Sequence, residues 1–161
     1  MASASDRLAE LGLKLPPVAA PVAAYVPALR VGDLVYSSGQ LPSVAGQVVA
    51  TGKVGAEVSA ETGASCARTA VLNALAAVSD QAGGIDEIAR VIRVVVFVAS
   101  APDFTDQAIV ANGASQVLGD VFGDAGRHVR SAVGVAVLPL DAPVEVELVV
   151  QVVTRPSVIP V

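Results

Sequence analysis

Two runs of alternating residue types stand out near the end of the chain. Residues 130–137 have valines at alternate positions, and Arg130 shares the opposite face with alanine and glycine. Residues 144–150 carry Glu145 and Glu147 in an otherwise apolar run. Alternation of period two predicts strands, and a charge within a buried strand is costly unless it is paired or binds something. Arg130 beside small side chains therefore indicates the floor of a pocket for a small anion.

The rest of the pattern predicts three helices and three further strands. β-Branched residues dominate residues 91–98, which favours a central strand. Ser5, Ser59 and Asp103 are candidate N-caps for the helices, and the glycine-rich residues 42–55 predict a loop. The predicted strands cover residues 23–31, 34–38 and 85–99, and the predicted helices cover residues 4–12, 59–82 and 103–123.

The order of the main elements, β-β-α-β-α-β-β, predicts an α+β fold with two helices on one face of a mixed sheet. The central strand is apolar on both faces, so the face without helices needs a partner, and self-association is the simplest source of one. We expect a single domain over residues 22–154, an N-terminal extension over residues 1–21 and a tail over residues 155–161.

Composition narrows the functional classes. The chain has 161 residues, is 53% hydrophobic and carries a formal net charge of −5, which fits a compact domain with a substantial core. An acidic chain without a cluster of Lys and Arg argues against nucleic-acid binding, because phosphate contacts need such clusters. The absence of tryptophan and the low aromatic content, 3%, remove the usual stacking platform for single strands.

Cysteine content and hydropathy predict a soluble protein of the cytoplasm. Cys66 is the single cysteine, so an intramolecular disulfide is excluded, as is usual in a reducing compartment. One His and one Cys do not supply the ligand spacing of a zinc site, so we expect no metal. No apolar run reaches the length of about 18 residues that a membrane span needs, and the N-terminus lacks the apolar core of a signal peptide.

Three separated motifs resemble those of one known family. Residues 36–42 read Y-S-S-G-Q-L-P, residues 94–98 form a valine-rich strand followed by Asp-Phe, and residues 130–133 read R-S-A-V and are followed by L-P and then V-E-V-E. These motifs resemble the RidA/YjgF family of reactive intermediate deaminases, which is also labelled the endoribonuclease L-PSP family. The resemblance runs over residues 24–152.

The resemblance implies a chorismate-mutase-like fold and a homotrimer, in which the sheets form an inner barrel and ligand clefts lie between subunits. Family members that have the arginine hydrolyse reactive 2-imino and enamino acids, such as 2-aminoacrylate, to 2-keto acids and ammonia. No cofactor is needed. The implied partners are therefore a small imino or keto acid and further copies of the chain.

The resemblance also assigns roles to residues. Arg130 matches the arginine that grips the substrate carboxylate, and its planar fork suits a bidentate contact. Glu145 matches the glutamate that holds the attacking water. Ser131 follows the arginine and is expected to contact substrate. The remaining matches around the cleft are Tyr25, Ser38, Gly39 and Asn112.

Other interpretations stay open at this stage. Arg130 could form a structural salt bridge with Glu145 or Glu147. His128, the only histidine, could enter the cleft or simply hydrogen-bond a loop. The chain could also be a non-enzymatic sensor of a small carboxylate such as a 2-keto acid. An endoribonuclease or translation inhibitor is disfavoured by the acidic charge.

Overall fold

The computed structural model describes residues 2–18 and 24–153, and it contains a five-stranded main sheet in the order β1-β2-β7-β5-β6. Neighbouring strands are antiparallel except for β5 and β6, which run parallel. The sheet is therefore mixed, as predicted. Its strands are β1 (Ala28–Val31), β2 (Leu34–Ser37), β5 (Ile88–Ala99), β6 (Val129–Val135) and β7 (Val144–Val152).

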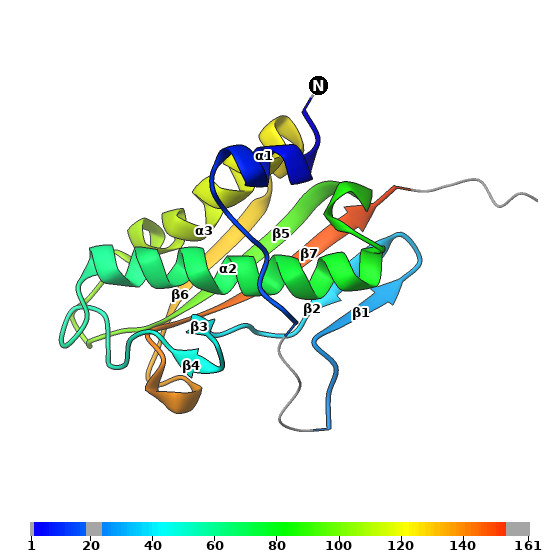
Figure 1. Cartoon of the computed structure of the whole chain (residues 1–161). Coiled ribbons are helices and arrows are strands. Elements are labelled where there is room, and N and C mark those ends of the chain that lie inside the picture. The colour runs from blue at the N-terminus through cyan, green and yellow to red at the C-terminus, as the bar shows by residue number, and fades with distance from the viewer. Residues whose placement is uncertain (1, 19–23, 154–161) are drawn as a thin grey trace, which may run out of the picture.

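Two long helices lie side by side across one face of this sheet (Figure 1). The parallel β5–β6 pair needs a crossover, and α3 provides it. The helices are α1 (Ala4–Glu10), α2 (Ala60–Ala82) and α3 (Gln107–Phe122), and the short 3-10 turns are η1 (Ile85–Glu87), η2 (Gly123–Gly126) and η3 (Pro139–Asp141). The α+β architecture predicted from the sequence is confirmed.

The core lies between the helices and the sheet and consists mostly of valine and alanine. Strand β7 shows the alternation clearly, because every second residue from Val144 to Val152 is buried against the helices. Its other residues, which include Glu145 and Glu147, face away from the helices. Small side chains let α2 and α3 pack closely: a Cβ on Gly113 would collide with the backbone carbonyl of Ala64.

Two helix starts differ from the prediction. Ser3, not Ser5, caps α1, because the Ser3 hydroxyl accepts from the Asp6 amide (3.1 Å) and the Asp6 carboxylate accepts from the Ser3 amide (3.0 Å). The Ser5 hydroxyl instead donates to the carboxylate of Asp86 (2.6 Å), which lies in the 3-10 turn η1 after α2. Helix α3 begins after Asp106 rather than Asp103.

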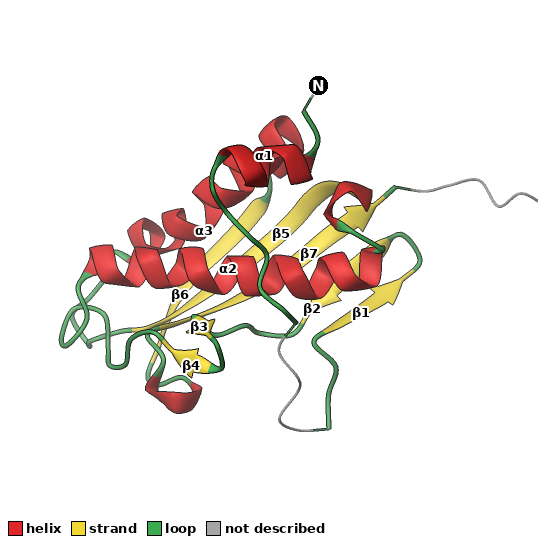
Figure 2. Cartoon of the chain, viewed as in Figure 1, coloured by secondary structure: helices red, strands yellow, loops and turns green. Residues whose placement is uncertain are grey.

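A small hairpin lies where the sequence predicted only a loop. Strands β3 (Ser43–Val44) and β4 (Gln47–Val48) flank a turn at Ala45 and Gly46, both of which have positive φ (Figure 2). The buried amide of Asn73 on α2 donates to the carbonyls of Leu41 (2.9 Å) and Ser43 (3.0 Å), which ties the hairpin to the helix layer. Two-residue strands are too short for alternation to reveal.

The sheet face that carries no helix exposes large apolar side chains. Leu29 on β1 is 58% exposed, and Val129 and Val133 on β6 are 66% and 42% exposed. An apolar surface of this kind is typical of a protein–protein contact.

The remaining findings concern membrane spanning, the predicted domain boundaries and helix α1. No helix within the described residues has the length and hydropathy to cross a bilayer. The predicted boundary between extension and domain, at residues 21–22, and the predicted tail at 155–161 lie outside the described residues. Helix α1, within the predicted extension, places Leu8 in the core.

Candidate functional site

Arg130 lies on the helix-covered face of β6. Its register partner on β5 is Val94, which is fully buried beneath the helices. Ala132 and Gly134 follow on the same face, as the alternation in the sequence predicted. The small side chains leave room for the guanidinium group, which turns toward α3.

Three neutral acceptors on α3 hold the guanidinium group of Arg130. Nη1 donates to Oδ1 of Asn112 (2.9 Å) and to Oγ of Ser115 (3.0 Å), and Nη2 donates to the carbonyl oxygen of Ala108 (3.3 Å). These positions share one face of α3 because they are spaced by three and four residues. Asn112, expected near the cleft from the resemblance, thus contacts the arginine directly.

This anchoring leaves part of the arginine available to a ligand. Within the described residues, Nε of Arg130 has no acceptor and Nη2 has only one. These two nitrogens form one edge of the planar group, the edge that can bind a carboxylate through two parallel hydrogen bonds. Neither Glu145 nor Glu147 pairs with Arg130 in the described chain, because both lie on the opposite face of the sheet. The salt-bridge interpretation therefore does not describe this chain.

Glu145 sits on the open face of β7, beside Phe97 of β5. Gly39 lies directly against it: a Cβ built on Gly39 would overlap Oε1 of Glu145 and lie 2.7 Å from the carboxylate carbon. The φ angle of Gly39 is ordinary, so a glycine is needed here for space rather than for backbone freedom. The segment that carries Gly39 is held against β7 by Gln40, which exchanges two backbone hydrogen bonds with Val146 (both 2.9 Å).

The carboxyl group of Glu145 is electrostatically disfavoured as an anion. Partial burial raises the pKa of Glu145 above its ordinary value of 4.5, and the like charge of Glu147 raises it further. The two carboxylates share the face because they are two residues apart on one strand. A raised pKa is common among carboxyl groups that transfer protons in active sites.

Tyr25 and Ser38 lie at the same corner as Gly39. The Ser38 hydroxyl donates to the carbonyl of Val26 (2.6 Å), and the Ser38 amide donates to the carbonyl of Pro27 (2.8 Å). These bonds hold the segment that carries Tyr25 against the end of β2. Tyr25 and Gly39 both line a cavity of about 420 Å³. Its other walls are mostly apolar and come from the N-terminal segment, the β3–β4 hairpin, α2 and η3.

Arg130 and Glu145 thus lie on opposite faces of the sheet. We call Arg130 with Asn112 and Ser115 the arginine group, and Glu145 with Gly39, Ser38 and Tyr25 the glutamate group. Ser131 belongs with neither: its register partner is Val95, which in turn pairs with Glu147 on the open face. Ser131 therefore points away from the guanidinium group of the residue before it.

His128 contacts the arginine group, although the sequence alone left its role open. Its Nε2 lies 2.9 Å from Oγ of Ser115, and its Nδ1 lies 2.6 Å from the carbonyl oxygen of Gly126. Ser115 was not predicted as a site residue. The signal for it was present, since Asn112 and Ser115 are three residues apart on one helix.

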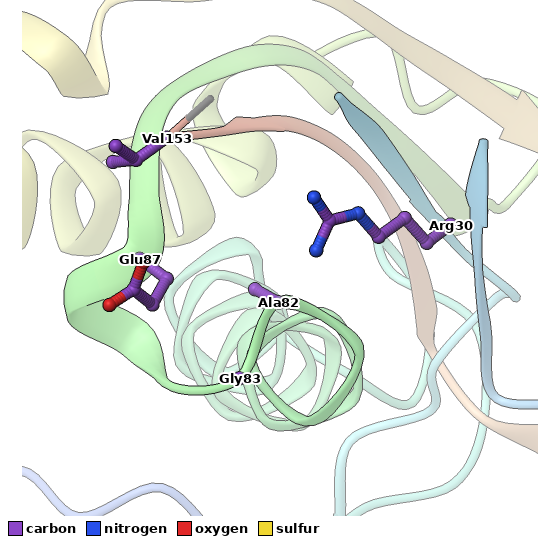
Figure 3. Close-up of a pocket in the computed structure, with 5 residues that line it drawn as sticks. All are labelled: Arg30, Ala82, Gly83, Glu87 and Val153. Carbon is purple, nitrogen blue, oxygen red and sulfur yellow. The ribbon is translucent and has the colours of Figure 1, made fainter. Parts of the chain in front are cut away.

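A separate hollow lies at the C-terminal end of α2. It is lined by Arg30, Ala82, Gly83, Glu87 and Val153, and Arg30 extends into it from β1 (Figure 3). Helix C-termini carry partial negative charge, which disfavours an anion there. None of the described residues predicted for the site lines this hollow.

Neither metal chemistry nor thiol chemistry is supported by the described residues. No group of three or more His, Cys, Asp or Glu side chains in this part of the chain could hold a metal ion. Cys66 is buried in α2, and burial raises the pKa of its thiol, so it is an inert packing residue.

Comparisons with known proteins agree with the fold and with the motifs. A family model described as "YjgF/chorismate mutase-like, putative endoribonuclease" matches residues 5–152. The chain is 43% identical over 145 residues to protein TCP17 of Trypanosoma cruzi, covering 89% of this chain and 91% of that one.

Solved structures give the same result. The crystal structure of Atu1372 from Agrobacterium tumefaciens, a protein of unknown function, is 42% identical, covers 93% of each chain and has a TM-score of 0.86. The structure of E. coli TdcF with bound serine is 26% identical, covers 85% of this chain and 93% of that one, and has a TM-score of 0.61. The chain therefore belongs to the YjgF/chorismate mutase-like family, also known as the RidA or L-PSP family.

Proposed function

We propose that this protein is a hydrolytic deaminase of reactive 2-imino and enamino acids, which it converts to 2-keto acids and ammonia. The observation that carries the proposal is the anchored guanidinium group of Arg130. It is held by three neutral acceptors, and its Nε–Nη2 edge keeps donors for an incoming carboxylate. Bound serine in TdcF, a relative that shares the fold, supports a small amino-acid-like carboxylate as the class of ligand.

We further propose that each site is shared between two subunits of a homotrimer whose sheets form an inner barrel. Arg130 and Glu145 lie on opposite faces of one sheet, so a single small substrate cannot reach both within one chain. The exposed apolar side chains on the open face, such as Leu29 and Val133, supply a surface for assembly. The arginine group of one subunit would then meet the glutamate group of its neighbour.

The chemistry needs little beyond positioning. Arg130 holds the carboxylate, and an enamine first takes a proton from solvent at carbon to become the iminium ion. Glu145 accepts a proton from water as the water oxygen bonds to the iminium carbon. Glu145 then returns this proton to the carbinolamine nitrogen. The carbon–nitrogen bond breaks as the hydroxyl oxygen forms the carbonyl, and the hydroxyl proton leaves with the ammonia as ammonium, so Glu145 ends in its starting state. A carboxyl group whose pKa is raised accepts a proton more readily than an ordinary carboxylate does.

The activity is tested by a coupled assay in which a dehydratase generates the imino acid in place. Wild-type protein is expected to accelerate 2-keto acid release, and Arg130→Ala is expected to lose the acceleration. Gln116→Ala serves as a control, because Gln116 is exposed on the same helix as the anchor residues. A folded wild type that accelerates neither 2-iminopropanoate nor 2-iminobutanoate hydrolysis refutes the proposal for these substrates.

Subunit mixing tests the shared site directly. Arg130→Ala and Glu145→Gln subunits are each expected to be inactive alone. In randomly mixed trimers, about a quarter of the sites join a native arginine to a neighbour's native glutamate, because each site of a cyclic trimer draws on two chains. Restored activity of that size supports the shared site. No restoration in trimers shown by mass spectrometry to be mixed excludes it.

A second candidate is a non-enzymatic receptor for a small carboxylate such as a 2-keto acid. The anchored arginine favours it as much as it favours catalysis, because binding needs only the arginine group. Stabilisation of the fold by 2-oxobutanoate, without turnover of any imino acid, would select this function. An endoribonuclease is a weaker candidate, because the chain has a net charge of −5. We also propose a cytoplasmic location, because the sequence has a single cysteine and no apolar run long enough for a membrane span.

A further inference from the structure

The imidazole ring of His128 is joined to the guanidinium group of Arg130 through one hydroxyl group. Ser115 Oγ lies 2.9 Å from Nε2 of His128 and 3.0 Å from Nη1 of Arg130. On its other side, Nδ1 of His128 lies 2.6 Å from the carbonyl oxygen of Gly126 in η2. The three side chains therefore form a continuous hydrogen-bonded chain that ends on the backbone.

Chemistry allows one arrangement of protons along this chain when the ring is neutral. A carbonyl oxygen can only accept, so Nδ1 must carry the proton that is shared with Gly126. Nε2 is then the acceptor, and the Ser115 hydroxyl donates to it. A guanidinium nitrogen can only donate, so the lone pairs of the Ser115 oxygen face Arg130. Every donor in the chain meets an acceptor.

We propose that Ser115 and His128 are positioning residues that orient Arg130 for the substrate carboxylate. Neither touches substrate. The inference rests on the proposed function, because it assigns the chain a role in carboxylate binding. Without the imidazole, the hydroxyl hydrogen of Ser115 could turn toward other acceptors, and Nη1 would lose a defined partner. Asn112 is exposed, so the partly buried Ser115 is the better-defined anchor.

The proton arrangement can be read directly because His128 is the only histidine in the sequence. A two-dimensional ¹H–¹⁵N spectrum tuned to long-range ring couplings gives one set of imidazole signals. The expected tautomer of the neutral ring is the one that carries its proton on Nδ1. A ring protonated on Nε2 overturns this hydrogen-bonding arrangement, since Oγ of Ser115 would then face two donors and the carbonyl oxygen of Gly126 none. This measurement does not depend on enzymatic activity.

The functional role is tested with substitutions along the chain. Ser115→Ala and His128→Phe are each expected to raise KM, and the dissociation constant for 2-oxobutanoate, by about 10-fold with kcat nearly unchanged, which is typical of lost ground-state binding. The double variant is expected to match the single ones, because both break the same chain. His128→Gln keeps an acceptor near the Nε2 position and is expected to stay close to wild type.

Each outcome decides a separate point. Gln116→Ala is the control, because Gln116 is next to Ser115 but is exposed and takes no part in these hydrogen bonds; it is expected to bind 2-oxobutanoate like wild type. Folded Ser115→Ala and His128→Phe variants that bind 2-oxobutanoate normally overturn the positioning role. Additive effects in the double variant also overturn it, because the residues would then act independently. A wild type that neither binds 2-oxobutanoate nor turns over an imino acid overturns the proposed function itself, and the spectrum still shows whether the chain exists.

Discussion

Gly39→Ala tests the glutamate group by moving one carboxylate. The added Cβ would overlap Oε1 of Glu145 and lie 2.7 Å from its Cδ and 3.0 Å from its Cγ, whereas ordinary van der Waals contact begins near 3.4 Å. The backbone of Gly39 is not in a left-handed conformation, so alanine brings no strain of its own. The conflict is therefore with the end of a flexible side chain.

The expected consequence is a displaced carboxylate in an intact fold. Relief of the overlap requires the Glu145 carboxylate to retreat by about 1 Å or more, and a misplacement of that size can lower the rate of an enzyme by about 100-fold. The free energy of unfolding should fall by only about 1 kcal/mol, because no core packing or backbone hydrogen bond is lost. Binding of 2-oxobutanoate at Arg130 should change little.

The assay compares kcat/KM in the coupled deaminase reaction with the unfolding midpoint in urea. Gly119→Ala is the matched control: Gly119 is exposed on α3 and nothing lies near its added Cβ, so activity should be unchanged and stability should rise slightly. A Gly39→Ala variant with wild-type kcat/KM would refute the proposal that Glu145 activates the attacking water. A variant that unfolds would refute the claim that the glycine serves only to make space.

Three further predictions follow from burial and charge. Burial, and then the charge of Glu147, raise the pKa of Glu145 in the folded state, so the ionised carboxylate destabilises the fold above that pKa. Below about 4.5 the group is protonated in the folded and unfolded states, and the destabilisation disappears. In urea titrations, the free energy of unfolding of Glu145→Gln should exceed that of wild type at high pH, and this difference should shrink as the pH falls toward 4.5; a difference that does not change with pH would contradict the prediction. Val133→Asp places a charge on the exposed apolar face and should give a smaller species by light scattering, whereas Gln116→Asp on the helix side should not; an unchanged mass for Val133→Asp excludes that face as the contact. The buried thiol of Cys66 should react with a thiol reagent only as fast as the protein unfolds, and prompt reaction in the native state would show that α2 opens locally.

The helices and strands of the main sheet could be predicted because their periodicity is strong. The dense valine run gave β5, and Ser59 with the glycines after Ala82 bounded α2 as the structure has it. The ends were harder. Ser3 and Ser5 are both good capping residues; the reciprocal bonds between Ser3 and Asp6 make Ser3 the cap, and Ser5 bonds to Asp86 instead.

The sequence supplied candidate residues for a site but not their arrangement. Alternation separates Arg130 from the valines of β6, yet it does not say which face the helices cover. The helices cover the face with the small residues, and the valines, such as Val129 and Val133, are the exposed side. The link from His128 through Ser115 depends on where η2 ends against α3, which no local pattern encodes.

The division of the site between two faces of one sheet has a consequence for how the protein behaves at different abundances. A chain on its own carries both the arginine group and the glutamate group, but they point in opposite directions from the sheet that separates them. Under the proposed function, dilution below the dissociation constant of the assembly would abolish turnover while leaving every chain folded. Specific activity would then rise with protein concentration, so the rate of synthesis of the chain would set not only how many sites exist but whether each of them works.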